Sequence, residues 1–343
     1  MLKAGTRLTA PILRIEDLSA EFVTPDGTVK AVNHVSLSLR EGGTLALTGE
    51  SGSGKTSVAL CTLNLLPHPG RITGGRILLN DSDLLSFTNE QLRQVRGRDI
   101  AIVFQDPATG LNPVLSVGQQ VEEIITNHLD VPRREAKRRT VEVLAQMGLP
   151  DPAQVATRYP FQLSGGMSQR VMIAIATALN PKVLILDEPT SALDVTVQAA
   201  ILQDLRRLQQ IYGTSILLIT HDLGIVAQMA EEVAVIYAGS VVEFSDAPTL
   251  FARPRHPYTW SLLGSRPRWD REREARLPSI RGTPPSLIDL PDECPFVPRC
   301  PKAINVCRTE RAPALTPLET GHLAACYNPI YQAEPARAGI RLD

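Results

Sequence analysis

The segment GESGSGKT at Gly49–Thr56 decides the fold of this chain of 343 residues. It has the spacing G-x-x-x-x-G-K-[ST], in which a glycine-rich turn is followed by a lysine and a hydroxyl residue. The apolar run Thr44–Thr48 precedes the segment and a helical pattern follows it. This is the strand–loop–helix setting that the motif requires, so the sequence predicts a loop that binds phosphate groups.

The residue types in this loop have the chemistry that phosphate binding requires. Glycines let the backbone turn tightly and point its N–H groups toward phosphate oxygens. Lys55 would place a cation on the β- and γ-phosphates of ATP, and Thr56 would offer a hydroxyl oxygen to Mg²⁺. A glycine-rich turn that only resembles a phosphate loop is the alternative. The expected ATP- and Mg²⁺-binding residues are Gly49, Ser51, Gly52, Ser53, Gly54, Lys55, Thr56 and Ser57.

Short apolar runs elsewhere in the chain predict the rest of the sheet. Besides Thr44–Thr48 they cover residues 100–104, 182–187 and 215–220, each bounded by polar residues or glycine. Such runs are typical of buried strands in a mainly parallel sheet. An amphipathic helix is expected between the last two runs, with an apolar face formed by Val197, Ile201, Leu205, Leu208 and Ile211. The alternation of strands and helix predicts an α/β fold.

Other regions depart from this pattern. Residues 12–45 and 70–85 alternate short apolar bursts with turns, which predicts antiparallel strands beside the main sheet. Residues from about 107 to 172 are rich in helix formers and lack strand runs, which predicts a helical subdomain. We expect one ATPase domain over residues 12–247, and a C-terminal extension, richer in proline and arginine, over residues 248–343.

The apolar run at Val183–Leu186 ends on two carboxylates, Asp187 and Glu188. The carboxyl ends of parallel strands are where an α/β sheet places a nucleotide site. There Asp187 would hold Mg²⁺ through water, and Glu188 would polarise an attacking water. Two acids that merely surface at a strand end are the alternative, but the phosphate loop upstream favours the nucleotide site.

Four further motifs resemble those of ABC ATPases and follow the order of that family. LSGGMSQR at Leu163–Arg170 resembles the signature motif, with Met167 in the place of the usual glutamine. Gln105 resembles the glutamine that couples Mg²⁺ to a permease, and His221 resembles the switch histidine. A segment that resembles the D-loop comprises Ser191, Ala192, Leu193 and Asp194. The resemblance implies a P-loop NTPase fold of the ABC type.

In that family two ATPase subunits close over two nucleotides, so that each site is shared between subunits. The resemblance implies that ATP held by a second subunit is contacted by Leu163, Ser164, Gly165, Gly166 and Met167. It implies catalytic roles for Glu188, His221 and Gln105. The family also stacks adenine on an aromatic residue ahead of the phosphate loop. Phe22 is our candidate for that role, and an ordinary strand residue is the alternative.

The segment HPYT at His256–Thr259 resembles one that characterises the ATPases of oligopeptide, dipeptide and nickel importers. This resemblance implies an ATPase that powers the import of peptides or a related small solute. It implies a second ATPase subunit, a paralogue rather than a second copy, and two membrane permease subunits. An extracytoplasmic solute-binding protein would be an indirect partner. We therefore expect a peripheral subunit on the cytoplasmic face of the inner membrane.

Four of the five cysteines lie close together in the C-terminal extension, at Cys294, Cys300, Cys307 and Cys326. Cytosolic proteins rarely hold disulfides, so such a group is typical of a metal site. The close cysteine pairs of a zinc ribbon are missing, and thiolates on a proline-rich loop suit a [4Fe–4S] cluster. Importer ATPases that this chain resembles also carry such a cluster. We expect an iron–sulfur cluster, with Zn²⁺ or unliganded thiols as alternatives.

The composition bears on the remaining alternatives. Lys and Arg number 35 against 36 Asp and Glu, and this balance disfavours nucleic acid as a partner. No apolar run approaches the roughly 18 residues that a membrane-spanning helix needs.

The alternative function is a soluble ABC ATPase that acts on DNA or ribosomes, but such proteins usually carry tandem cassettes or a long coiled coil. A regulatory ATPase without a transporter is a third possibility.

Overall fold

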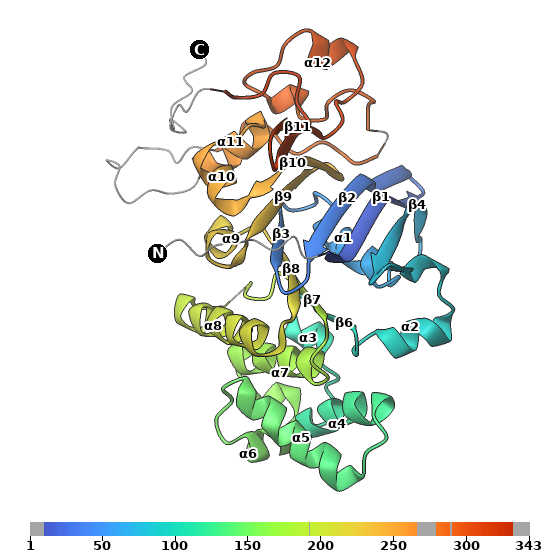
Figure 1. The fold of residues 1–343 in the computed structure, drawn as a ribbon, viewed down its shortest axis with the longest axis vertical. Coiled ribbons are helices and arrows are strands. Elements are labelled where there is room, and N and C mark those ends of the chain that lie inside the picture. Colours follow the sequence, from blue (N-terminus) through green and yellow to red (C-terminus); the bar gives the residue numbers. More distant parts are fainter. Residues whose placement is uncertain (1–9, 192, 266–278, 289, 332–343) are drawn as a thin grey trace.

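The fold is described from a computed structural model of the chain. The structure describes residues 10–191, 193–265, 279–288 and 290–331. The C-terminal segments lie at one end of the long axis, the two β-sheets lie in the middle, and a group of helices lies at the other end (Figure 1).

An eight-stranded sheet forms the centre of the molecule, in the order β11-β12-β10-β9-β3-β8-β7-β6. Its parallel part comprises β3 (Thr44–Thr48), β6 (Ile100–Val103), β7 (Val183–Asp187), β8 (Ser215–Thr220) and β9 (Glu232–Tyr237). Nearly every residue of these strands is buried, because helices or the second sheet cover both faces. The four strands predicted from apolar runs are therefore confirmed.

Antiparallel strands from the end of the chain extend this sheet. They are β10 (Ser240–Asp246), β11 (Thr316–Glu319) and β12 (His322–Ala324). Strand β10 pairs with β9, β12 pairs with β10, and β11 pairs with β12. The hairpin of β11 and β12 was not predicted from the proline-rich composition. It makes the C-terminal extension part of the same sheet as the strand that precedes the phosphate loop.

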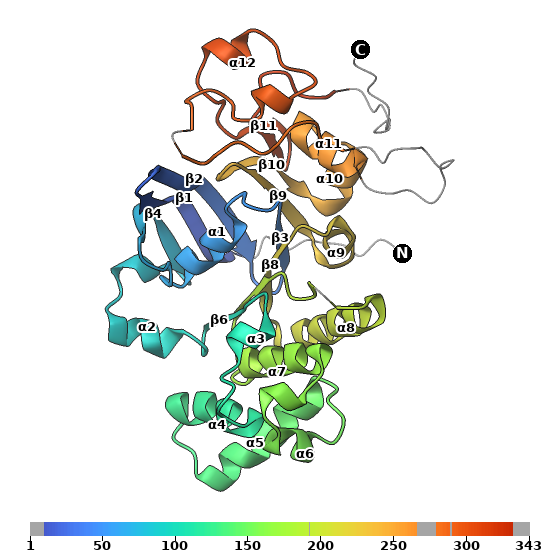
Figure 2. The same ribbon diagram turned by 180° about the vertical axis from the view of Figure 1, so that it is seen from behind.

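The second sheet is antiparallel, as predicted, and has the order β2-β1-β4-β5. Its strands are β1 (Pro11–Thr24), β2 (Gly27–Arg40), β4 (Gly70–Leu79) and β5 (Ser82–Asp83). Helix α1 (Lys55–Thr62) contacts strands of both sheets and contributes Val58, Ala59 and Cys61 to their shared apolar core. Figure 2 shows α1 beside both sheets, so the core holds the first residues after the phosphate loop in place.

The expected helical subdomain is present on the far side of β6 and β7. Its helices are α3 (Pro107–Gly110), α4 (Val117–His128), α5 (Arg133–Gln146), α6 (Pro152–Thr157) and α7 (Gly165–Thr177). All of them except α3 share a second apolar core with β6, β7, β8 and α8 (Val195–Tyr212). The start of α7 is therefore tied to the central sheet as well as to the helical group.

Helix α8 has the predicted apolar face except at its end. Ile201, Leu205 and Leu208 are buried, whereas Ile211 is 58% exposed. The prediction for Ile211 was wrong because this residue lies in the last turn, where Tyr212 is also 39% exposed.

Short elements complete the fold. They are η1 (Leu84–Ser86), α2 (Asn89–Val95), η2 (Pro160–Gln162), α9 (Leu223–Met229), α10 (Ala247–Ala252), α11 (Pro257–Gly264), η3 (Val297–Arg299) and α12 (Val306–Thr309). Among the helices that the structure describes, none is long and apolar enough to span a membrane.

Candidate functional site

The phosphate loop joins the end of β3 to α1 and lies against two other strands. A Cβ atom on Gly49 would lie 2.2 Å from the carbonyl oxygen of Ile236 in β9. A Cβ atom on Gly54 would lie 2.1 Å from the carbonyl oxygen of Ala31 in β2, and the φ angle of Gly54 is +102°. Any side chain at either position would clash with backbone, so the shape of the loop depends on these glycines.

Lys55 lies inside the loop and is 6% exposed. Its Nζ donates hydrogen bonds to the carbonyl oxygens of Gly49 and Glu50, at 2.9 and 2.8 Å. Burial lowers the pKa of the ammonium, and the nearby carboxylates of Glu188, Asp187 and Glu50 partly offset this effect. The cation and the acids of β7 therefore lie at the same end of the sheet.

Of the other loop residues, Ser53 is buried and Ser57 is half-buried, while Ser51, Gly52 and Thr56 are exposed. The Ser53 hydroxyl oxygen is buried without a hydrogen-bond partner among the described residues. The outer part of the loop is thus open to a ligand, whereas its base is anchored in the protein.

Asp187 ends β7 and is 2% exposed. Within the described part of the chain its Oδ1 has no hydrogen-bond partner. Burial raises the pKa of this carboxyl, and a hydrogen bond with the Thr56 side chain partly offsets the rise. A buried carboxylate oxygen without a partner, beside a hydroxyl, is the kind of oxygen donor set that Mg²⁺ takes. The two residues therefore fit a Mg²⁺ site.

Glu188 and His221 are brought together because their strands are neighbours. His221 Nδ1 lies 2.8 Å from Oε1 and 2.7 Å from Oε2 of Glu188. The Glu188 side chain is 13% exposed and that of His221 is 62% exposed. Glu188 has a φ angle of +50°, and its N–H donates to the carbonyl oxygen of Ile219 at 2.8 Å. Left-handed backbone at a residue other than glycine is strained, and such strain is concentrated at functional sites.

Gln105 and the segment that resembles the D-loop lie close together beside this pair. The Ser191 hydroxyl donates to the carbonyl oxygen of Glu188 at 3.0 Å and lies 3.5 Å from that of Gln105. Gln105 is exposed and follows β6. Its backbone is therefore placed beside the acidic end of β7, while its side chain lies at the surface.

Asp194 ends the same segment as the N-cap of α8. Its Oδ1 accepts hydrogen bonds from the N–H groups of Thr196 and Val197, at 3.0 and 2.9 Å. Leu193 is half-buried, and Ala192 lies outside the described residues. Part of this segment thus has a local structural role in starting α8.

The signature segment starts α7. Ser164 is its N-cap, and its hydroxyl accepts a hydrogen bond from the N–H of Met167 at 3.3 Å. Ser164 and Gly165 are exposed, while Leu163, Gly166 and Met167 are half-buried. In the described part of the chain no hydrogen bond or ion pair joins this segment to the phosphate loop. The structure therefore does not bring the two together within one chain.

Phe22 is a half-buried residue of β1, opposite Val29 of β2 and Gly70 of β4. A Cβ atom on Gly70 would lie 2.7 Å from the Phe22 ring, so the ring packs over this glycine. Its role in stacking adenine stays a prediction.

The C-terminal extension contacts the phosphate loop, which the sequence did not predict. The N–H of Glu50 donates to the Tyr258 hydroxyl oxygen at 2.8 Å, and the Arg299 guanidinium donates to both oxygens of the Glu50 carboxylate. The HPYT segment was the one signal that singled out Tyr258, but it indicated no contact. Nothing in the sequence distinguished Arg299 or Glu50 from other charged residues.

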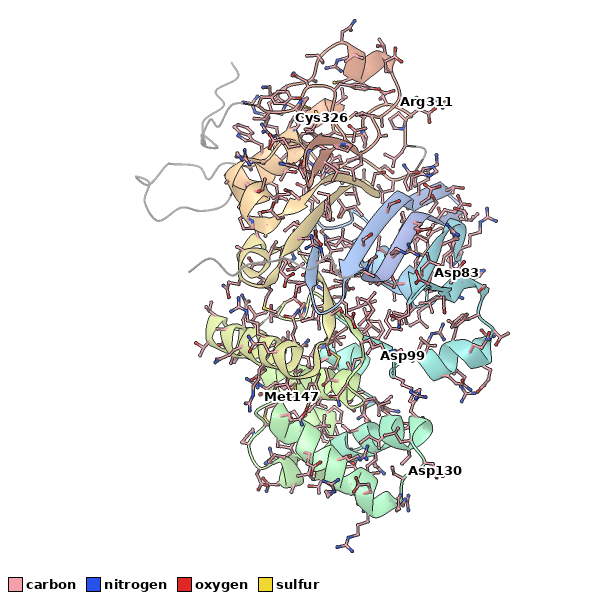
Figure 3. The ribbon with its side chains drawn as sticks, viewed as in Figure 1. Asp83, Asp99, Asp130, Met147, Arg311 and Cys326 are labelled. Carbon is pink, nitrogen blue, oxygen red and sulfur yellow. The ribbon has the colours of Figure 1, made fainter. Side chains whose placement is uncertain are left out.

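The prediction of a metal site at the four cysteines was wrong. The thiols of Cys294, Cys300, Cys307 and Cys326 line one small cavity of about 10 Å³. However, no group of three or more His, Cys, Asp or Glu side chains in the described ranges could hold a metal ion. Burial raises the pKa of Cys300 to about 11 and that of Cys326 to about 12, so both stay protonated at neutral pH. Cys294 and Cys300 pack against the apolar cluster that contains Phe296, and Cys307 is buried; Figure 3 labels Cys326 in the same extension.

Two family descriptions match the chain. The ABC transporter family matches residues 32–191, and the C-terminal region of oligopeptide and dipeptide transporters matches residues 242–307. The first match includes the phosphate loop, the signature segment and the acidic end of β7. The second includes the HPYT segment, η3 and three of the four clustered cysteines.

Curated relatives match along almost the whole chain. The oligopeptide transport ATP-binding protein OppD of Escherichia coli is 44% identical over 93% of this chain and 94% of its own. The dipeptide transport ATP-binding protein DppD of Bacillus subtilis is 43% identical over 95% and 97%. Among solved structures, the dimeric post-hydrolysis state of the ATP-binding cassette MJ0796, bound to ADP and Pi, has a TM-score of 0.63 at 26% identity and covers 68% of this chain and 98% of that one.

Proposed function

The chain belongs to the family of ATP-binding subunits of oligopeptide and dipeptide ABC transporters, and from this premise we propose that it hydrolyses ATP to power peptide import. One observation carries the proposal. Lys55, the adjacent pair Asp187 and Glu188, and His221 come from three separate segments and meet at one end of the central sheet. In that order, these residues would supply the four groups that ATP hydrolysis requires: a cation, a metal-binding acid, a general base and a partner for the γ-phosphate.

The phosphate loop binds the β- and γ-phosphates of ATP. Its N–H groups and the start of α1 provide a site for anions, and Lys55 adds a full charge. The carbonyl oxygens of Gly49 and Glu50 hold the Lys55 ammonium inside the loop. Because the cation is already ordered, little conformational entropy is lost when phosphate binds.

Thr56 and Asp187 are the residues that hold Mg²⁺ in this proposal. When bound, Mg²⁺ neutralises charge on the phosphate oxygens. The buried Oδ1 of Asp187 supports this assignment, since it has no other partner among the described residues. Both residues supply oxygen, the donor that Mg²⁺ prefers.

Glu188 is the general base that takes a proton from the attacking water, and His221 holds the γ-phosphate. The water oxygen forms a bond to the γ-phosphorus as the bond between that phosphorus and the oxygen bridging to the β-phosphate breaks, so ADP leaves with the bridging oxygen and inorganic phosphate is released. The contact between Glu188 and His221 supports these roles, because it orients the carboxylate at the edge of the site. Gln105 lies beside them and reports the state of the site to a permease.

A second ATPase subunit completes the site. The signature segment at Leu163–Met167 presents the exposed residues Ser164 and Gly165 at the start of α7, apart from the phosphate loop of its own chain. Its Ser164 hydroxyl and N–H groups contact ATP held by the partner subunit. We expect the partner to be a paralogue, and the related cassette with ADP and Pi is a dimer. ATP binds the closed dimer better than the open one, which drives closure.

Two permease subunits carry the peptide, and a solute-binding protein delivers it to them. The ATPase is then a peripheral subunit on the cytoplasmic face of the membrane. This function is favoured over that of a soluble ABC ATPase acting on DNA or ribosomes, because the chain matches peptide-transport subunits over 94% and 97% of their length.

The experiment is to co-express the chain with the permease and partner genes beside its own gene and to purify the complex. Peptide-stimulated ATP hydrolysis in proteoliposomes is expected, together with uptake of a labelled peptide. A chain that hydrolyses ATP but never associates with a permease would contradict the transport function and leave the ATPase function standing.

A further inference from the structure

We infer that the C-terminal extension is a positioning element of the ATP site, in which Tyr258 and Arg299 hold the phosphate loop through Glu50. This inference rests on the proposed ATPase function, because ATP is the ligand whose binding is positioned. Glu50 is the second residue of the loop, and both of its partners lie more than two hundred positions further along the chain.

Three groups of Glu50 are fixed at once. Its N–H donates to the Tyr258 hydroxyl oxygen at 2.8 Å. Its carboxylate accepts two hydrogen bonds from Arg299, 2.6 Å from Nη1 to Oε2 and 2.9 Å from Nη2 to Oε1. Its carbonyl oxygen accepts hydrogen bonds from Lys55 Nζ at 2.8 Å and from the N–H of Ser53 at 3.3 Å. The extension therefore holds Glu50 on one side, while the phosphate-binding lysine bonds to it on the other.

The partners of Glu50 are themselves rigidly held. The Arg299 side chain is 5% exposed, and its guanidinium lies 5.9 Å from the centre of the Tyr237 ring. The Tyr237 and Tyr258 rings lie 4.6 Å apart, and Phe296 contacts both. Two further hydrogen bonds restrain Arg299, to the carbonyl oxygen of Arg281 at 2.9 Å and to the Tyr237 hydroxyl at 3.3 Å. A planar, paired guanidinium in an aromatic cluster is a stiff support.

This arrangement affects ATP binding in two ways. A loop that is held before ATP arrives loses less conformational entropy on binding. The Glu50 carboxylate also belongs to a loop that binds anions, and the Arg299 charge offsets its repulsion of phosphate. Loss of Arg299 removes both the restraint of the loop and the compensation of the Glu50 charge. Loss of the Glu50 charge, in contrast, removes the repulsion of phosphate that Arg299 offsets. Arg299 thus acts on ATP through Glu50 and touches no reacting atom itself.

The test measures the affinity of the full-length chain for a fluorescent ATP analogue with Mg²⁺. Arg299→Met is expected to weaken binding about tenfold, which lies within the range of site-to-site coupling. Glu50→Gln in the Arg299→Met background is expected to restore the part of that affinity that the unpaired Glu50 charge costs, while the part that comes from the lost restraint of the loop stays lost. Arg255→Met is the matched control, because Arg255 is a buried arginine of the same region that pairs with Glu319 and does not contact the loop.

Tyr258→Phe provides a second variant that keeps the ring and removes only the hydroxyl. It is expected to weaken ATP binding by a smaller factor than Arg299→Met, and its affinity still tests the inference if Arg299→Met does not fold. The inference would be overturned if Arg299→Met and Tyr258→Phe bound the ATP analogue as tightly as the control variant Arg255→Met. The inference would also be overturned if the effects of Arg299→Met and Glu50→Gln on the affinity for ATP were additive in the double variant. A wild-type chain that binds no ATP would instead contradict the proposed function.

Discussion

His221 and Glu188 share one contact at the carboxyl ends of two neighbouring parallel strands, with Nδ1 2.8 Å from Oε1 and 2.7 Å from Oε2. The two residues are far apart in the sequence and are aligned only because β7 pairs with β8. The carboxylate is mostly buried while the imidazole is mostly exposed. In the proposed hydrolysis, this contact lets an exposed imidazole, which a ligand can reach, set the orientation of the Glu188 carboxylate.

Glu188→Gln is expected to bind ATP with little change in affinity and to lower the rate of hydrolysis by about 10²–10⁴-fold, the usual contribution of a general base. The amide keeps the size and the hydrogen-bonding capacity of the side chain but cannot accept the proton. Steady-state release of phosphate and equilibrium binding of ATP test the two halves of this prediction. Near-normal turnover would contradict the role of Glu188, and Glu293→Gln, an exposed acid of the extension, is the control.

Lys55→Ala is expected to abolish measurable ATP binding, because it removes the buried cation that the loop carbonyls hold in place. The mutant retains the loop glycines and the packing of α1, so its thermal stability without nucleotide should change little. The measurement is the rise in melting temperature on adding MgATP, which the wild type should show and the mutant should lack. An undiminished rise in the mutant would mean that ATP binds elsewhere.

Glu243→Ala is expected to destabilise the protein by about 3–5 kcal/mol, the cost of removing one partner from a buried, charged network. Glu243 is fully buried and accepts hydrogen bonds from the N–H groups of Arg255 and His256, at 2.6 and 2.9 Å, and from His322 at 2.7 Å. All three donors would be left without this acceptor. Urea unfolding measures the loss, with Glu293→Ala at the surface as the control.

The stability of the protein is expected to decrease as the pH is lowered, because of His256. This side chain is 2% exposed, and burial lowers its pKa to about 4 from an ordinary value of 6.5. Between these values the unfolded chain binds a proton that the folded chain does not, so stability is complete above pH 6.5 and is lost as pH falls toward 4. The difference between these pKa values corresponds to roughly 3 kcal/mol.

His256→Asn tests this assignment. Asparagine can still accept the hydrogen bond that the N–H of Tyr258 donates to His256 Nδ1, at 3.0 Å, but it does not titrate in this range. Urea unfolding of both proteins at several pH values should show their stability difference shrinking as the pH falls. A difference that is independent of pH would contradict the role of His256.

The sequence predicted the parts of the molecule that depend on local patterns. The strand at Thr44–Thr48, the phosphate loop and the acidic end of β7 were recognised because periodicity, glycine spacing and strand ends are written in short segments. Their assembly at one edge then followed from the parallel sheet. The contact between Glu188 and His221 follows from the same rule, since it requires only that β7 and β8 be neighbours.

What the sequence could not predict depends on pairings between distant segments. Glu50 resembles any other variable residue of a phosphate loop until the extension folds back and places Arg299 beside it. The metal site predicted at the four cysteines was wrong for a different reason, because there a local pattern was present but the folded structure did not use it. The grouping of these cysteines indicated a metal site, but the described side chains form no group that could hold a metal ion, and partial burial raises the pKa of Cys300 and Cys326.

The pairing of β12 with β10 has a consequence for how the chain can be divided. A chain ended at residue 247 would retain the phosphate loop, the signature segment and strands β7 and β8. It would also expose one edge of β10, whose N–H and C=O groups pair with β12 in the intact chain. Unpaired strand edges recruit other strands, so the shortened chain is expected to aggregate edge to edge. The extension thus also protects the open side of the sheet against self-association.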